Sequence, residues 1–285
     1  MSEWLDKGSV RRAFSKAASR YDEVAVLQRE IGQRMLDRLH LVRLKPATVL
    51  DLGAGTGVAT VALEKIYPKA QVIALDFAFP MLQQTRRRGG LFRKPSCLCA
   101  DLEQLPLADA SVDLIYSNAA IQWCNDLDRV FPELQRVLRP GGLLMFTTFG
   151  PDTLQELRAA WSEADGYAHV SRFLDMHDIG DALMRAQFSD PVMDVDRMTL
   201  TYSAVEELMR ELKILGAHNV ASGRQRALTG KGRLIAMKAS YEQFRRNGLL
   251  PASYEVVYGH AWAPLQSQQS GVTLVSLDRI GRRPA

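Results

Sequence analysis

Apolar positions along the middle of the chain fall into short blocks that predict strands, each followed by a segment of helical periodicity. The five apolar runs have the length and the polar flanks of buried strands. They lie at 47–52, 71–76, 96–100, 112–117 and 143–149. Helical periodicity occurs at 58–67, 80–88 and 126–138. Strands and helices that alternate over short connections predict a parallel sheet covered on both faces.

The pattern on either side of this block predicts further helices and two more strands. Apolar residues recur at three- and four-residue steps early in the chain, which predicts one helix over 10–41. They are Val24, Leu27, Ile31, Met35 and Leu39. Helices are expected near 152–164 and 175–187, strands near 191–202 and at 252–262, and a helical stretch over 204–246. Because strands flank it on both sides, we expect 204–246 to be an insertion packed on the sheet domain.

Composition narrows the class of protein. The 285 residues are 47% hydrophobic and 24% charged, as in ordinary globular proteins. No window reaches the ~18 uninterrupted apolar residues that a membrane helix needs, and Met1–Lys7 contains acids where a signal peptide requires basic residues. The three cysteines have no spacing typical of a metal site. We therefore expect a cytoplasmic protein without a structural metal.

Charge is distributed unevenly along the chain. The net charge is +4, but residues 1–45 hold 10 basic and 6 acidic residues, and residues 204–246 hold 9 and 4, which leaves −5 elsewhere. A nucleic-acid-binding protein with a uniformly basic surface would not show this pattern. Two basic helical segments on an acidic body suit an enzyme that docks an acidic macromolecule, and solvated helix faces are the alternative explanation.

A glycine-rich turn joins the first predicted strand to the helix after it. Gly53, Gly55 and Gly57 form a G-x-G-x-G pattern, and glycine allows close approach of a ligand to the backbone. The dinucleotide pattern G-x-G-x-x-G fails, because Val58 and Thr60 stand where its last glycine would be. No phosphate-binding P-loop pattern occurs. The turn predicts a ligand at the carboxyl ends of the strands that is not a typical dinucleotide.

Three acidic residues at strand ends indicate the nature of that ligand. Asp51 next to the glycines would repel a pyrophosphate and attract an ammonium group. Asp76 ends the second strand, where a carboxylate can accept hydrogen bonds from two ribose hydroxyls. Asp101 follows the third strand and can accept a hydrogen bond from an adenine amino group. A positively charged, ribosylated adenine ligand fits these acids, so we expect S-adenosylmethionine rather than NAD or ATP.

The residues of this region resemble class I S-adenosylmethionine-dependent methyltransferases across 46–149. The resemblance implies a Rossmann-like, seven-stranded, mostly parallel sheet whose last strand is antiparallel. It also implies a division into an N-terminal helical lid (1–45), a methyltransferase core with a helical cover (46–203), a basic helical insertion (204–250) and a final strand with its tail (251–285). The implied cofactor-binding residues are Asp51, Gly53, Ala54, Gly55, Gly57, Asp76, Phe77, Met81, Asp101, Leu102 and Asn118.

Segments outside this region are similar to the malonyl-acyl-carrier-protein O-methyltransferases of biotin synthesis. They are 14–22, 27–28, 117–123, 146–158, 172–180, 228–230 and 258–262. The resemblance implies methyl transfer from S-adenosylmethionine to the free carboxylate of malonyl-acyl-carrier protein or malonyl-CoA. The methyl ester would prime pimeloyl synthesis for biotin. The implied partner is an acidic acyl carrier protein, with no nucleic acid and no membrane.

The acceptor chemistry and the same resemblance select candidate substrate residues. A carboxylate nucleophile has an ordinary pKa of about 4, so it is ionised at pH 7 and needs no general base. Catalysis would then consist of alignment and exclusion of water. Arg172, Tyr21 and Phe173 are the candidate catalytic residues. Arg172 would hold the malonyl carboxylate, and further substrate contacts are expected from Gln122, Trp123, Arg158 and Arg20.

Three alternative functions stay open from the sequence. Relatives that assist assembly of respiratory complex I, acting as hydroxylases or methyltransferases, share the glycine loop but are expected to lack arginine at position 172. A quinone-pathway methyltransferase resembles the chain only over 10–150. A non-enzymatic scaffold would use the basic helices to bind a partner.

Overall fold

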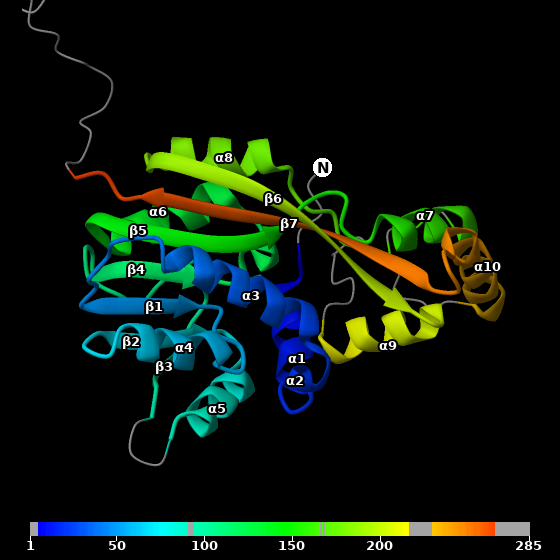
Figure 1. Cartoon of the computed structure of the whole chain (residues 1–285), viewed down its shortest axis with the longest axis horizontal. Helices are drawn as coiled ribbons and strands as arrows, with labels where there is room; N and C mark the ends of the chain where they lie inside the picture. Colours follow the sequence, from blue (N-terminus) through cyan, green and yellow to red (C-terminus); the bar gives the residue numbers. More distant parts are fainter. Residues whose placement is uncertain (1–4, 91–93, 166, 168, 217–229, 266–285) are drawn as a thin grey trace, which may run out of the picture.

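One seven-stranded sheet organises the chain (Figure 1). The computed structural model describes residues 5–90, 94–165, 167, 169–216 and 230–265. The strand order is β3-β2-β1-β4-β5-β7-β6. The strands are β1 (Thr48–Leu52), β2 (Gln71–Asp76), β3 (Ser96–Cys99), β4 (Val112–Ser117), β5 (Leu138–Phe149), β6 (Ser189–Tyr202) and β7 (Leu250–Trp262).

The direction of the strands confirms the predicted sheet. The pairs β1–β2, β2–β3, β1–β4 and β4–β5 are parallel. Strand β7 is antiparallel to both β5 and β6, so it alone runs against the others. The carboxyl ends of the parallel strands therefore meet at one edge, where ligands of such sheets bind.

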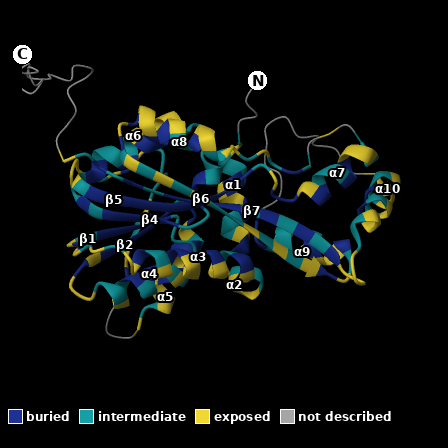
Figure 2. Ribbon diagram, turned by 45° about the horizontal axis from the view of Figure 1, so that its top comes forward, coloured by how far each residue is buried: buried dark blue, intermediate teal, exposed yellow. Residues whose placement is uncertain are grey.

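Helices cover both faces of the sheet, as the alternating pattern predicted. They are α4 (Val58–Ile66), α5 (Phe79–Arg88), α6 (Leu127–Val137) and α8 (Met176–Arg185), with the short η1 (Ile121–Trp123). Helix α7 (Gln155–Ala164) instead lies at the far end of β7. Successive strand residues alternate between the two layers: Val49 packs with Leu63 of α4, whereas Leu50 packs with Phe131 of α6. The central strands β1, β4 and β5 are accordingly buried, whereas β3 and β6 at the two edges are partly exposed (Figure 2).

The N-terminal segment folds into three helices, so the prediction of one helix over 10–41 is wrong. They are α1 (Lys7–Ala17), α2 (Tyr21–Val24) and α3 (Val26–Leu39). Tertiary contacts account for the breaks. The carboxylate of Asp22 accepts a hydrogen bond from Thr56 Oγ1 at 2.7 Å and an ion pair from Arg88, while Arg29 donates to the Asp22 carbonyl at 2.6 Å. These contacts fix α2 against the glycine loop at the expense of a continuous helix.

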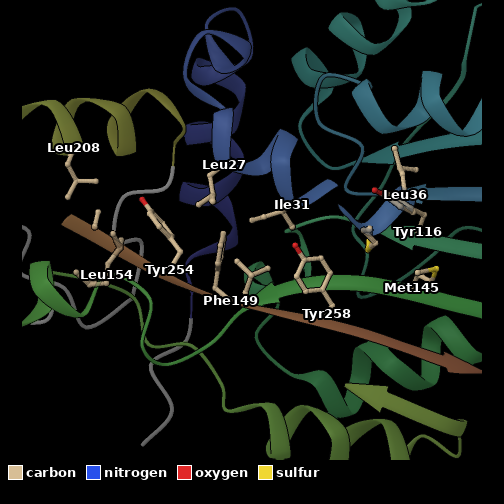
Figure 3. Close-up of a cluster of buried hydrophobic side chains, with 14 of the residues drawn as sticks. Leu27, Ile31, Leu36, Tyr116, Met145, Phe149, Leu154, Leu208, Tyr254 and Tyr258 are labelled. Carbon is tan, nitrogen blue, oxygen red and sulfur yellow. The ribbon is translucent and has the colours of Figure 1, made fainter. Parts of the chain in front are cut away.

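Helix α3 lies across the sheet and brings the N-terminal segment to the strand ends. Leu27 and Ile31 lie over Phe149, and Leu36 lies beside Tyr116, all in one buried cluster (Figure 3). Gly32 permits this close contact, because a Cβ there would lie 2.9 Å from Asn118 Nδ2. The Tyr116 hydroxyl donates to the Gly32 carbonyl at 2.9 Å, which fixes α3 over β4.

Strands β6 and β7 extend beyond β5 and carry the remaining helices. The β5–β7 pairing ends at Phe149 and Val256, while β6 and β7 stay paired as far as Tyr202 and Leu250. The helices at this end are α7, α9 (Val205–Ile214) and α10 (Lys231–Tyr241), followed by η2 (Glu242–Phe244). Residues 217–229 of the predicted insertion, and 228–229 of the segments used for the family resemblance, lie outside the described residues. None of the described helices has the length and apolar character required to cross a bilayer.

Candidate active site

The glycine loop leaves β1 and enters α4 with three left-handed glycines. The φ values of Gly53, Gly55 and Gly57 are +74°, +56° and +82°. A Cβ at Gly53 would lie 2.3 Å from Ala120 Cβ, and one at Gly57 would lie 2.6 Å from Thr85 Cγ2. A Cβ at Gly55 would meet nothing within 4 Å. The outer glycines therefore allow close packing, and the middle one faces open space.

Two adjoining cavities lie along this loop. The helix-side cavity, about 130 Å³, is enclosed by α3, the loop and β4, and its lining includes Gln28, Arg29, Asp51, Ala54 and Asn118. The strand-edge cavity, about 60 Å³, is lined by residues that include Asp76, Phe77, Met81, Leu102 and Trp123. Tyr21, Gly53, Gly55 and Asn118 line both. Of the residues expected around the cofactor, only Gly57 and Asp101 line neither.

The two buried acids at the strand ends carry raised pKa values. Burial raises the pKa of Asp51 to about 7, and the charge of Asp76 adds to this, although a hydrogen bond of 2.5 Å from Thr60 Oγ1 opposes it. Burial likewise raises the pKa of Asp76 to about 6, against the hydrogen bonds from the backbone N–H groups of Ala78 and Gly55 at 2.8 and 2.9 Å. Desolvated carboxyl groups of this kind favour a cationic or hydroxyl-rich ligand that restores their solvation.

Asp101 is held outside the cavities by an ion cluster. Lys7 Nζ at the start of α1 contacts both Asp101 carboxylate oxygens at 2.8 and 2.7 Å and the Glu103 carboxylate at 2.7 Å. The expected hydrogen bond from an adenine amino group to Asp101 would therefore have to compete with Lys7. Leu102, the next residue, lines the strand-edge cavity instead.

Aromatic side chains from four segments enclose the strand-edge cavity. The Phe14 ring of α1 contacts Trp123, Phe77 and Tyr21, with centroid distances of 5.2, 6.1 and 6.5 Å. Burial raises the pKa of the Tyr21 hydroxyl, and the nearby charge of Asp76 acts in the same direction. Tyr21 therefore stays protonated and can only donate or accept a hydrogen bond, which excludes its use as a phenolate base at neutral pH.

A third cavity, the outer cavity, brings together three of the candidate catalytic and substrate residues, Gln122, Arg172 and Phe173. It measures about 260 Å³, and its lining includes Gln122, Phe149, Arg172, Phe173 and Leu174. The amide of Gln122 is held by its donation to the Ala119 carbonyl at 2.6 Å. Trp123, the next residue, lines the strand-edge cavity, so the two cavities lie on either side of the Gln122–Trp123 pair.

The three candidate arginines occupy different environments. Within the described ranges, exposed Arg172 has neither an ion pair nor a hydrogen bond. Arg158 does not line the outer cavity; its guanidinium donates to the carbonyls of Pro151 and Thr153 at 2.8 and 2.9 Å. Burial lowers the pKa of Arg158, and the positive charge of Arg172 acts in the same direction. Arg20 is exposed, pairs with Glu23 at 3.0 Å and lines none of the three cavities.

Several lining residues have no counterpart among the sequence candidates. They are Phe14, Gln28 and Arg29, together with Lys7, which holds Asp101. Their position depends on how the N-terminal helices fold back over the strand ends. Phe14 and Gln28 carried a signal, as parts of segments similar to the family, and that signal gave them no role. Within the described residues, no group of three or more His, Cys, Asp or Glu could hold a metal ion.

The sheet order and the glycine loop define the class of protein. A family model described as a methyltransferase domain matches residues 50–146. A methyltransferase structure from Bacillus halodurans superposes with a TM-score of 0.57 at 18% identity, covering 81% of this chain and 99% of that one. The chain is a methyltransferase with a Rossmann-like fold.

More similar sequences identify the family within this class. A malonyl-acyl-carrier-protein O-methyltransferase from Methylovorus sp. is 57% identical over 91% of this chain and 90% of its own length. A protein of the same name from Halorhodospira halophila is 50% identical over 98% of this chain and 97% of its own. The chain belongs to the malonyl-acyl-carrier-protein O-methyltransferase family.

Proposed function

We propose that the protein transfers a methyl group from S-adenosylmethionine to the free carboxylate of malonyl-acyl-carrier protein, forming the methyl ester that primes pimeloyl synthesis for biotin. The observation that carries the proposal is the outer cavity, which adjoins the cofactor cavities and presents an arginine without a partner among the described residues. The complex I and quinone-pathway alternatives lack comparable support, since neither requires a cation there. Cytoplasmic location stays a prediction from the sequence.

The two inner cavities fit S-adenosylmethionine. Asp76, at the end of β2, would accept from the ribose hydroxyls, while Phe77, Met81 and Leu102 provide an apolar wall for the adenine. Asp51 would bind the ammonium group in the helix-side cavity. Asn118 separates the two cavities and is held by hydrogen bonds to the Gln28 carbonyl and from Thr147 Oγ1 at 2.9 and 2.8 Å.

The acceptor would enter through the outer cavity. The guanidinium of Arg172 would bind one edge of the malonyl carboxylate, because its fork matches the geometry of a carboxylate. Phe173, whose ring centroid lies 5.7 Å from that of Phe149, would exclude water from the same site. Tyr21, which lines both inner cavities, would contact the cofactor, while the Gln122–Trp123 pair would mark the boundary between donor and acceptor.

The reaction requires alignment rather than proton transfer. S-adenosylmethionine supplies an electrophilic methyl group on a positively charged sulfur. A carboxylate oxygen forms the new bond to carbon as the carbon–sulfur bond breaks, so charge is neutralised and no proton moves. The absence of a Ser/His/Asp or Cys/His arrangement around the described cavity residues agrees with this chemistry. Arg172 orients the anion, and the aromatic walls remove its water.

The charge on the N-terminal helices supports docking of an acidic carrier protein. Several cations of 1–45 are occupied by ion pairs, but Arg11 and Lys16 on α1 are exposed and have no ion pair within the described ranges. Helix α1 packs on α5, which exposes Arg86 and Arg87. We propose this α1–α5 face as the docking surface. In the second basic segment, Lys238 and Arg245 are paired with acids.

The test is mass spectrometry of malonyl-acyl-carrier protein after incubation with enzyme and S-adenosylmethionine. We expect the mass of malonyl-carrier protein to increase by one methyl group and the mass of acetyl-carrier protein to stay unchanged. Arg172→Ala should abolish methylation of malonyl-carrier protein while cofactor affinity stays near normal. Arg172→Lys should retain little methylation activity, because lysine lacks the bidentate geometry.

The matched control is Arg185→Ala on α8, since Arg185 pairs with Asp128 at 2.8 Å and lines none of the three cavities. Wild-type turnover by Arg172→Ala would refute the assignment of Arg172. Methylation of acetyl-carrier protein would refute recognition of a free carboxylate.

A further inference from the structure

The amino-acid end of the cofactor presents two opposite charges that the residues assigned so far do not both satisfy. This inference rests on the proposed function, because it takes S-adenosylmethionine as the ligand of the inner cavities. Asp51 accounts for the ammonium group. The carboxylate needs a hydrogen-bond donor or a cation in the same helix-side cavity, since leaving an ionised group unpaired in a partly enclosed site is costly.

The first three N–H groups of the glycine loop are already used within the protein. The backbone N–H groups of Gly53 and Ala54 both donate to the Leu75 carbonyl, at 2.8 and 2.9 Å. The N–H of Gly55 donates to Asp76 at 2.9 Å. The loop therefore uses these donors to hold its own shape, and because it contains no basic residue, a cation for the carboxylate has to come from another element.

Helix α3 places a cation at the required position. Among the described residues that line the helix-side cavity, Arg29 alone carries a basic side chain. One of its Nη atoms donates to the Asp22 carbonyl at 2.6 Å, which orients the guanidinium. Within the described ranges it has no ion pair with an acid, so its other N–H groups stay available.

The preceding residue adds an acceptor without a partner. Gln28 lines the same cavity, and its Oε1 is buried with no hydrogen-bond partner among the residues that the structure describes. Its backbone is fixed, because the Gln28 carbonyl accepts from Asn118 Nδ2 at 2.9 Å. A buried amide oxygen without a donor is rare in native proteins and indicates that a ligand supplies one.

We propose that Gln28 and Arg29 on α3 recognise the amino-acid end of the cofactor. Arg29 binds the carboxylate, while Gln28 Oε1 shares the ammonium group with Asp51. The N-terminal helices therefore do more than cover the site. They distinguish a complete cofactor from adenosine thioethers that lack the amino-acid end.

The experiment compares two probes by calorimetry: S-adenosylhomocysteine, and 5′-methylthioadenosine, which has the same nucleoside and sulfur but no amino-acid end. Arg29→Gln should lower the affinity for S-adenosylhomocysteine about tenfold or more, in line with the loss of a charge-assisted hydrogen bond at a partly exposed site. Gln28→Leu should weaken it about fivefold. Both variants should bind 5′-methylthioadenosine as wild type does, which also shows that they fold.

The matched control is Arg34→Gln on the same helix, because Arg34 pairs with Glu30 and Asp196 and does not line the cavity. It should leave both affinities unchanged. Wild-type S-adenosylhomocysteine affinity in Arg29→Gln would overturn the inference and indicate that the first-turn amides of α4 hold the carboxylate. Equal loss for both probes would also overturn it. Failure of the wild-type protein to bind either probe would instead refute the proposed function.

Discussion

Gly55 offers the sharpest test of where the cofactor lies, because a side chain at this position would enter the cavity rather than the protein. A Cβ there would meet no protein atom within 4 Å, and Gly55 lines both inner cavities. Replacement by alanine or valine should therefore reduce ligand binding far more than stability.

The cost to stability can be worked out from the backbone. A left-handed φ of +56° costs an L-residue about 1–2 kcal/mol, and the lower entropy of the unfolded chain returns about 0.4–1 kcal/mol. The net loss is about 1 kcal/mol, which corresponds to a fall of about 2–4 °C in Tm. In the liganded protein, each added methyl group must displace the cofactor or be overpacked against it, at about 1–3 kcal/mol. Gly55→Ala should weaken the binding of S-adenosylhomocysteine about 5- to 150-fold, and Gly55→Val should abolish it.

A second glycine provides the matched control. Gly248 has a φ of +80°, and a Cβ there would also meet nothing within 4 Å, but it lies in the turn before β7 and lines none of the three cavities. Gly248→Ala should lower Tm by the same amount, about 2–4 °C, and keep the wild-type affinity for S-adenosylhomocysteine in calorimetry. Wild-type binding by Gly55→Val would refute the placement of the cofactor along the loop. A Tm loss in Gly55→Ala far above that of Gly248→Ala would refute the reasoning from open space.

Two further predictions concern charge. Because burial raises the pKa of Asp51 to about 7, the affinity for S-adenosylhomocysteine measured by calorimetry should fall as the pH is lowered from 7.5 to 5.5. The reason is that the protonated acid cannot pair with the ammonium group. A pH-independent affinity, or the same dependence of affinity on pH in Asp51→Asn, would contradict this. Reversal of Arg11 and Lys16 to glutamate should raise KM for malonyl-acyl-carrier protein and flatten its salt dependence without changing KM for malonyl-CoA. The same reversal at exposed Arg43 and Lys45, near the opposite edge of the sheet, should have no effect, and equal effects of the two pairs would show that only net charge matters.

The alternation of strands and helices and the glycine loop could be predicted from the sequence because each depends on local chemistry. A buried strand such as 112–117 needs mostly apolar residues, and the close approach at Gly53 and Gly57 excludes any side chain. Asp51 and Asp76 follow from the same logic, since the carboxyl ends of parallel strands meet at one edge whatever lies around them. These features required only the order of residues along the chain.

The environment of each charged side chain depended on the tertiary structure. Lys7 reaches Asp101 across 94 positions, and Asp22 joins Thr56 and Arg88, which breaks the predicted N-terminal helix. Hydrogen bonds and ion pairs between distant segments leave no periodic signal in the sequence. The same limit applies to Arg20 and Arg172, because the sequence alone does not show which of these two candidates lines a cavity.

The contribution of α3 to the site was likewise beyond the sequence. The apolar positions of this helix predicted which face would be buried, and Leu27 and Ile31 are buried as expected. They could not show that the helix would lie across the end of β4, where Gly32 contacts Asn118. That placement turns Gln28 and Arg29 toward the cavity. The sequence by itself determined the sheet, the loop and the acids at the ends of β1 and β2. Only the packing of the N-terminal helices against the strand ends decided which side chains complete the lining of the inner cavities, because long-range contacts rather than local periodicity fix the position of these helices.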